Sequence, residues 1–200
     1  MLKLEDYKVI FVAVGLIGLL LFASPALSLM VHFSGEEKFS ELWILGPGHM
    51  AEDYPSNVKP NENYLVYLGV GDHLGSPAYY RVYVKFRNQT EPLPDVTAGL
   101  PSPIPLLYEY RVFLSNGQAS ETPLTFSFSD IEIADNRSFV GSLTINNATL
   151  NVGKLAEWDA QNTGYYYELF MELWVYNVES NSFQFHNRFV SLRVNLTDSV

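Results

Sequence analysis

The sequence predicts an all-β protein: an immunoglobulin-like antiparallel β-sandwich of seven to nine strands, preceded by one N-terminal transmembrane helix. Three observations predict this. Apolar and polar residues alternate at every second position in several segments, clusters of Gly, Pro, Asn and Asp separate these segments, and one long uncharged run lies near the N-terminus. An aromatic content of 14 %, with 13 Tyr and 13 Phe, also favours strands.

The uncharged run covers residues 9–31. As a helix it would extend roughly 34 Å, enough to cross a hydrocarbon core about 30 Å thick. A cleaved signal peptide is the alternative, because Ala26-Leu27-Ser28 is a small-residue cleavage pattern. Signal peptides have shorter apolar cores of about 7–15 residues, so the length favours a permanent signal anchor in the lipid bilayer.

The charges around this run predict its orientation. Lys3, Lys8 and the terminal amine precede it, whereas acidic residues dominate after it. The positive-inside rule then makes residues 1–8 cytoplasmic, residues 32–38 a linker and residues 39–200 an extracytoplasmic domain of a single-pass cell-membrane protein. Four N-x-S/T motifs agree with this location and are candidate glycosylation sites: Asn88, Asn136, Asn147 and Asn195.

Six segments of the domain are the main predicted strands: 64–71, 78–87, 106–114, 122–129, 165–177 and 189–196. The clearest is 78–87, where one face carries Tyr80, Val82, Val84 and Phe86, and the other carries Tyr79, Arg81, Tyr83, Lys85 and Arg87. In 165–177, one face carries Tyr167, Leu169, Met171, Leu173 and Val175, and the other carries Glu168, Phe170, Glu172 and Trp174.

The connections are predicted from their turn residues. We expect the turns at 115–118 and 178–183 to close hairpins, and 142–153 to add an inserted hairpin. A short helix is considered at 153–161. The Pro-rich excursion at 91–105 is interpreted as a surface crossover, with a functional loop as the alternative.

Bulk properties exclude several function classes. A net charge of −10 argues against a nucleic-acid partner. The absence of cysteine excludes disulfides, thiolate nucleophiles and cysteine-based metal sites. No H-E-x-x-H, G-x-S-x-G or phosphate-loop motif is present. We therefore expect a non-enzymatic protein without catalytic residues, metal ligands or a cofactor.

The stretch "GPGHMAEDYPSN" at 46–57 concentrates titratable side chains. A remote alternative is a metal-dependent hydrolase that uses His49, Glu52, Asp53 and His73, if their loops meet. Calcium binding through Glu52, Asp53 or Asp72 is a similar possibility without the usual spacing. The preferred interpretation is a shaped connection, in which Tyr54 packs and the two acids face water.

Residues 46–86 resemble a known pattern: G-P-x-G-x-A-x-x-Y-P, a polar turn, a "YLGVG" strand, Asp72-His73 and an aromatic strand. The pattern resembles the archaeal membrane-anchored family filed as domain of unknown function 1616, and weaker similarity covers most of 38–196. The resemblance implies an anchored, extracytoplasmic β-domain. It implies no reaction and supplies no catalytic residues.

The leading functional hypothesis is protein interaction, as an accessory subunit of a membrane complex such as an oligosaccharyltransferase or other envelope or secretion machinery. The alternative is a carbohydrate- or cell-envelope-binding module that stacks glycan on Trp43, Trp158 or Trp174. The purely structural alternative is that these three rings pack in the core. The sequence predicts neither the oligomeric state nor the partner.

Overall fold

The computed structural model describes residues 7–8, 11–19 and 37–196, which fall into two separate units, Met1–Glu37 and Lys38–Val200. In the first unit, residues 7–8 and 11–19 are helical. Across these described ranges, no helix is both long and apolar enough to cross a membrane. Most of the predicted anchor at 9–31 lies outside the described residues, as do His32 and most of the linker.

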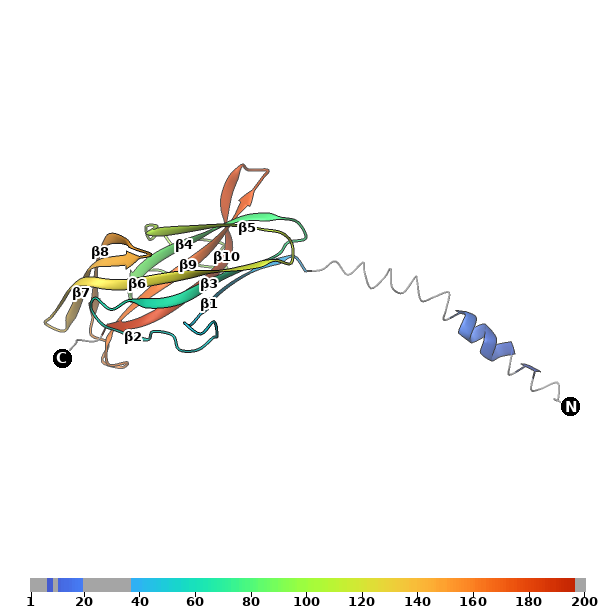
Figure 1. Ribbon diagram of the computed structural model, residues 1–200, viewed down its shortest axis with the longest axis horizontal. Coiled ribbons are helices and arrows are strands. Elements are labelled where there is room, and N and C mark those ends of the chain that lie inside the picture. The colour runs from blue at the N-terminus through green and yellow to red at the C-terminus, as the bar shows by residue number, and fades with distance from the viewer. Residues whose placement is uncertain (1–6, 9–10, 20–36, 197–200) are drawn as a thin grey trace. The chain divides into compact units, whose positions relative to one another are not determined.

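The second unit is an all-β domain of two five-stranded sheets, which confirms the predicted class (Figure 1). Sheet A has the order β1-β3-β6-β7-β8 and sheet B the order β2-β10-β9-β4-β5. The strands are β1 (Phe39–Leu45), β2 (Asn57–Val58), β3 (Tyr64–His73), β4 (Ala78–Asn88), β5 (Tyr108–Leu114), β6 (Ala119–Ala134), β7 (Arg137–Ile145), β8 (Ala148–Glu157), β9 (Tyr165–Asn177) and β10 (Ser182–Leu196). The described part thus holds ten strands, whereas seven to nine were expected.

Six of the strands follow the immunoglobulin order. In that fold, strands A, B and E share one sheet and strands C, F and G the other. Here β1-β3-β6 and β4-β9-β10 are neighbours in the same way. The other four strands are the two-residue β2, β5 beside β4 at the edge of sheet B, and the β7–β8 hairpin. The hairpin extends sheet A and confirms the predicted hairpin at 142–153.

Two predictions about connections are wrong. The turn at 115–118 does not close a hairpin, because β5 pairs with β4 in sheet B and β6 continues in sheet A. Turn residues reverse the chain, but they do not choose the sheet that the next strand joins. The segment 153–161 contains no helix, because β8 continues to Glu157 and Ala156 is buried in the core. The β9–β10 hairpin is confirmed.

The core lies between the sheets and is built from the predicted inward positions. Tyr80, Val82, Val84 and Phe86 of β4 are all buried. The ring of Phe86 lies 5.4 Å from that of Phe128 in sheet A. Burying such rings away from water supplies most of the driving force for folding in a domain without disulfides.

The stretch 46–57 is a shaped connection, as preferred from sequence, although Tyr54, which was expected to pack, is 36 % exposed. Gly46 N donates to Met50 O at 2.8 Å, and the hydroxyl of Tyr54 donates to Ile44 O at 2.8 Å. A Cβ at Gly46 would lie 1.9 Å from Glu52 O, so only glycine fits there. The connection ends in β2, which pairs in parallel with Asn195 and Leu196 of β10.

Candidate functional site

The outward face of sheet B carries charged and aromatic side chains along its central strands. Cross-strand neighbours on β4 and β9 alternate charged and aromatic side chains, with Arg81 opposite Trp174 and Lys85 opposite Phe170. This face has two halves. The covered half consists of Lys85, Arg87, Phe170 and Glu172, all of which are buried. The bare half consists of Tyr79, Arg81, Tyr83, Phe113, Trp174, Tyr176, Phe183 and Phe185, none of which is fully buried.

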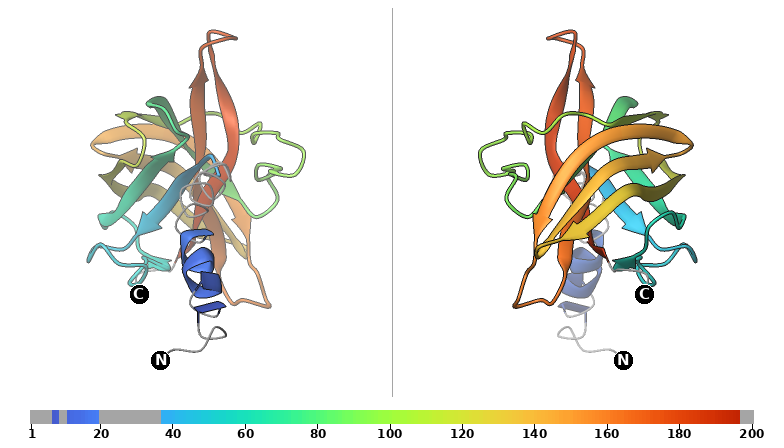
Figure 2. Two further views of the ribbon diagram at one scale, coloured as in Figure 1. Left: turned by 90° about the vertical axis from the view of Figure 1, so that its right-hand side faces the viewer. Right: turned by 90° about the vertical axis from the view of Figure 1, so that its left-hand side faces the viewer.

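The covered half lies under the excursion at 91–105, which Figure 2 shows as a light-green loop beside the sandwich. Lys85 Nζ lies 2.9 Å from Glu172 Oε2, in a buried ion pair. Ser102 supplies a further partner to each side chain: its N–H donates to Glu172 Oε1 at 2.7 Å, and its C=O accepts from Lys85 Nζ at 2.7 Å. A buried ion pair is tolerable only when the remaining polar atoms are satisfied in this way.

The excursion is also fastened internally. The hydroxyl of Ser102 donates to Pro92 O at 2.7 Å and accepts from the N–H of Ile104 at 3.3 Å. Ile104 is buried, and Glu91 forms an ion pair with Lys154 of β8. The segment is therefore held by hydrogen bonds and an ion pair over one half of the sheet. The sequence had predicted only a surface crossover.

In the bare half, six of the seven aromatic rings contact another ring of the group, and all seven stay partly exposed. The Tyr83 and Trp174 rings are 5.0 Å apart, and the Phe183 ring lies 5.3 Å from Tyr79 and 5.2 Å from Tyr176. The guanidinium of Arg81 lies 3.9 Å from the centroid of Phe183, a cation–π contact. These contacts hold the rings in fixed positions at the surface.

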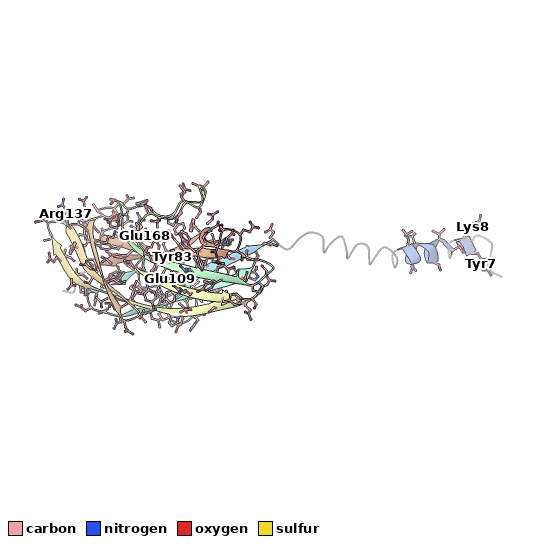
Figure 3. All side chains as sticks on the ribbon, turned by 90° about the horizontal axis from the view of Figure 1, so that it is seen from above. Tyr7, Lys8, Tyr83, Glu109, Arg137 and Glu168 are labelled. Atoms are coloured by element: carbon pink, nitrogen blue, oxygen red, sulfur yellow. The ribbon has the colours of Figure 1, made fainter. Side chains whose placement is uncertain are left out.

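One carboxylate organises the charges of the bare half. Glu109 of β5 lies directly opposite Tyr83 of β4, and Figure 3 labels both residues. It pairs with Arg81 at 3.5 Å and accepts a short hydrogen bond from Arg111. This hydrogen bond is the main cause that raises the pKa of Arg111. Phe113, on the same strand, is 66 % exposed and is the most accessible ring of the group.

A polar cleft at one end of the domain is the second candidate site. It encloses about 400 Å³ and is lined by Asn88, Gln89, Thr90, Leu155, Glu157, Trp158 and Asp159. Trp158 is 43 % exposed and meets the ring of Tyr165 edge-on at 5.1 Å. A smaller hollow adjoins the cleft, where Arg193 lies 4.0 Å over the ring of Tyr166. Hydrogen bonds from Asn162 are the main cause that lowers the pKa of Asp159.

The other two tryptophans are less available. Trp43 donates from Nε1 to Glu121 at 3.3 Å, and Trp174 donates to Glu172 at 3.2 Å. Of the three rings predicted to stack glycan, only Trp158 is exposed and lines an open polar cleft.

The predicted loop residues do not converge on a metal site. His49 Nδ1 lies 2.9 Å from Glu121 and the ring stacks on Tyr67, whereas His73 pairs with Glu41 at 3.3 Å. Glu52 and Asp53 face water, as preferred from sequence. Among the described residues, no group of three or more His, Asp or Glu is placed to hold a metal ion.

Asp72 is fully buried and accepts from the hydroxyl of Tyr80 at 3.1 Å. It is therefore not exposed beside Glu52 and Asp53, as calcium binding through Asp72 would need. In the His49–Glu121 pair, the hydrogen bond from His49 is the main cause that lowers the pKa of Glu121.

The four N-x-S/T motifs fall into two environments. Asn136 and Asn147 lie exposed in the turns at the two ends of β7. Asn88 and Asn195 are half-buried at the ends of β4 and β10, and their side-chain amides are hydrogen-bonded within the fold.

The sequence reasoning missed the bare half. Its signal was present in the outward positions of 78–87 and 165–177. These carry Tyr, Trp and Arg where a solvated strand face would carry small polar residues. Phe113 and Phe183 joined this set only once the pairing of β5 and β10 was known.

Solved structures give only distant likenesses. The CARDB domain of a Pyrococcus furiosus protein, in complex with di-metal ions, matches with a TM-score of 0.40 and 9 % identity, over 81 % of this chain and 90 % of that one. A β-glucosidase from Listeria innocua matches with a TM-score of 0.34 and 10 % identity, over 82 % of this chain but only 17 % of the enzyme. Likenesses this distant assign no ligand or activity. None of the curated proteins compared with the chain matches it.

A family model gives the decisive match. The model described as "Domain of unknown function (DUF1616)" matches residues 34–139, just over half of the chain. The matched region contains β1 to β6 and the pattern at 46–86 from which the family was predicted. The chain therefore belongs to the DUF1616 family.

Proposed function

We propose that the β-sandwich mediates protein interaction through the bare half of sheet B, as the extracytoplasmic domain of a single-pass membrane protein anchored by residues 9–31. The observation that carries this proposal is the group of partly exposed aromatic side chains around Arg81. The accessory-subunit role in a membrane complex rests on the predicted anchor and on a domain whose sequence has no catalytic motif.

The composition of the bare half supports a protein partner. Tyr, Trp, Phe and Arg are enriched in protein interfaces, whereas Lys, Asp and Ser are depleted. The bare half contains seven aromatic residues and one arginine, with Glu109 and Arg111 beside them. The ring contacts and the Glu109 ion pairs fix most of these side chains before binding, which lowers the entropic cost of association.

The charges suggest the chemistry of the partner. Arg81 and Arg111 share a single carboxylate, that of Glu109. A partner carboxylate or carbonyl beside apolar side chains would complement this arrangement. We place the partner in a complex that acts on the outer side of the membrane, with oligosaccharyltransferase or other envelope or secretion machinery as the concrete candidates.

Co-purification of the intact chain tests this proposal. The chain is extracted in gentle detergent, and bound proteins are quantified by mass spectrometry. The double variant Arg81→Ala/Phe113→Ser is expected to reduce partner recovery at least about tenfold, which corresponds to a loss of about 1.4 kcal/mol. The control is Met50→Ser, which replaces an exposed apolar side chain on the 46–57 connection. Equal recovery with both variants, or repeated recovery of the chain alone, would contradict the proposal.

A second function is supported by the end cleft. An exposed tryptophan beside amide and carboxylate groups is a suitable platform for a sugar ring, so a carbohydrate- or envelope-binding module is the alternative. Glycan-array binding that is lost in Trp158→Ala and kept in Arg81→Ala/Phe113→Ser would favour this function over protein interaction.

A further inference from the structure

The four N-x-S/T motifs differ in whether the asparagine side-chain amide is hydrogen-bonded within the fold. The Asn88 amide is hydrogen-bonded in this way. Its Nδ2 donates to Leu155 O at 2.8 Å, and its Oδ1 accepts from the N–H groups of Thr90 and Glu91 at 3.0 and 3.1 Å. The side chain thus fastens the start of the excursion to β8. A sugar on this nitrogen would have to fit between β4 and β8, where Asn88 is half-buried.

The side-chain amide of Asn195 is also hydrogen-bonded within the fold. Its Oδ1 accepts from Tyr165 N at 3.0 Å, and its Nδ2 donates to Asn57 at 3.2 Å. The carboxamide packs directly on Gly164, where even an added Cβ would lie 2.2 Å from Oδ1 and 2.7 Å from Nδ2. This site therefore has little room for an added group on the amide nitrogen.

Asn147 shows the opposite arrangement. It occupies the two-residue turn between β7 and β8 with a φ of 69°, and its side chain is exposed. Its neighbour Asn146 instead holds the turn to the rest of the domain. The Asn146 side chain accepts a hydrogen bond from Thr125 N at 2.9 Å and donates one to the Tyr110 hydroxyl at 2.5 Å. Within the described residues, the Asn147 amide makes no hydrogen bond. Thr149, the third residue of the motif, is exposed.

Asn136 is intermediate. It lies exposed in the turn between β6 and β7 with a φ of 58°. The third residue of its motif, however, is Ser138, which is completely buried. The motif requires this hydroxyl. In the folded domain, the Asn136 side chain is therefore accessible, whereas the Ser138 hydroxyl is not.

We infer that Asn147 is the principal N-glycosylation site, that Asn136 is modified less, and that Asn88 and Asn195 are unmodified structural asparagines. The inference rests on the extracytoplasmic location in the proposed function. The donor would be an oligosaccharide linked through phosphate to a lipid. The Asn147 nitrogen bonds to the anomeric carbon and loses one proton, and the carbon–oxygen bond to the lipid phosphate breaks.

The test begins with the location, measured independently of glycosylation. The sequence has no cysteine, so Val178→Cys introduces a single thiol at a position that is 82 % exposed at the tip of the β9–β10 hairpin. In intact cells, a membrane-impermeant maleimide is expected to label this thiol. Absence of labelling would contradict the proposed location. In that case the same chain behind a secretion signal tests the acceptor choice by itself.

Site occupancy is then measured by glycopeptide mass spectrometry, in a host that N-glycosylates exported proteins. Higher occupancy at Asn147 than at Asn136, with Asn88 and Asn195 unmodified, is the expected result, and Asn147→Gln should remove most of the glycan. Glycan on Asn88 or Asn195, more glycan on Asn136 than on Asn147, or an exported chain without glycan would each overturn the inference.

A second measurement separates the two classes without glycan. In a host that does not glycosylate, Asn88→Ala and Asn195→Ala are expected to lower the midpoint of thermal unfolding by at least about 2–4 °C, because each breaks several hydrogen bonds. Asn147→Ala and Asn136→Ala should leave it almost unchanged. Equal shifts in all four variants would remove the structural basis of the assignment.

Discussion

The two halves of the outward face of sheet B come largely from the same strands and the same alternation, yet they differ in almost every physical respect. In the covered half, Phe170 and the Lys85–Glu172 pair are buried under the excursion. In the bare half, Phe113 is 66 % exposed and the Arg81–Glu109 pair lies closer to water. The difference shows that a strand's periodicity assigns side chains to a face, whereas another segment decides whether that face becomes core.

The comparison also shows what makes the cover stable. Charged side chains cannot be buried unless their desolvation is offset by close partners. Ser102 supplies an N–H to Glu172 and a C=O to Lys85, so the backbone of the excursion completes the pair. The bare half has no such segment over it, and its rings remain accessible to a partner.

A matched pair of phenylalanines gives the largest expected contrast. Phe170→Ala should lower the free energy of unfolding by about 3–5 kcal/mol, because it leaves a cavity between the sheet and its cover. Phe113→Ala should change it by less than about 0.5 kcal/mol. Chemical denaturation followed by tryptophan fluorescence measures both. Similar losses in the two variants would show that the halves are not energetically distinct.

The buried ion pair should give the next largest effect. Lys85→Met leaves Glu172 charged and without its cation, which should cost about 3 kcal/mol. The double variant Lys85→Met/Glu172→Leu should recover much of this loss, because both charges are removed together. In the bare half, Arg111→Ala should cause no measurable loss, since the side chain is exposed. A double variant less stable than Lys85→Met would contradict this account.

Ser102→Ala should have a smaller and more local effect. It removes the hydroxyl that joins Pro92 O to Ile104 N, with an expected loss of about 1–2 kcal/mol. Limited proteolysis should then cut within 91–105 faster than in the unaltered chain. Thr97→Ala, at the exposed tip of the excursion, is the control and should leave the cleavage rate unchanged. An unchanged rate in Ser102→Ala would mean that the hydroxyl does not hold the cover.

The smallest expected effect concerns pH and His186, at the irregularity of β10 where its register with β9 shifts. Burial is the main cause that lowers the pKa of His186; Arg188 adds to it and Asp72 opposes it. The unfolded chain then binds more protons than the folded one near the ordinary histidine pKa of about 6.5. The stability contribution is complete above that pH and is lost as the pH falls through the lowered pKa. The midpoint of thermal unfolding, measured from pH 8 to pH 5, should therefore decline less in His186→Asn than in the unaltered chain.

Much of the fold followed from the sequence, because strand periodicity is a local property. The inward positions of 78–87 and 165–177 are those that the alternation predicted. The partner of each strand is a non-local property, so the sheet change after residues 115–118 was missed. Phe170 and Glu172 were correctly assigned to the outward face, but their burial depends on a Pro-rich segment some 70 residues earlier in the chain.

The candidate surface was hidden for the same reason. Its aromatic residues lie on two pairs of strands, β4–β5 and β9–β10, that are far apart in the chain, and only the pairing of β4 with β9 brings them together. His49, Glu52 and Asp53 form the more conspicuous sequence pattern because they are close together in the chain. In the fold, His49 pairs with Glu121 of β6, whereas Glu52 and Asp53 face water.

The parallel pairing of β2 with β10 has a consequence for behaviour at high concentration. An open sheet edge is a template on which a strand from another molecule can add, which leads to aggregation. Asn57 and Val58 occupy the pairing positions beside Asn195 and Leu196, and Asn195 N donates to Ser56 O at 2.7 Å. The connection that leaves β1 thus also shortens the free edge of sheet B, and it protects the chain from self-association while the bare half stays open.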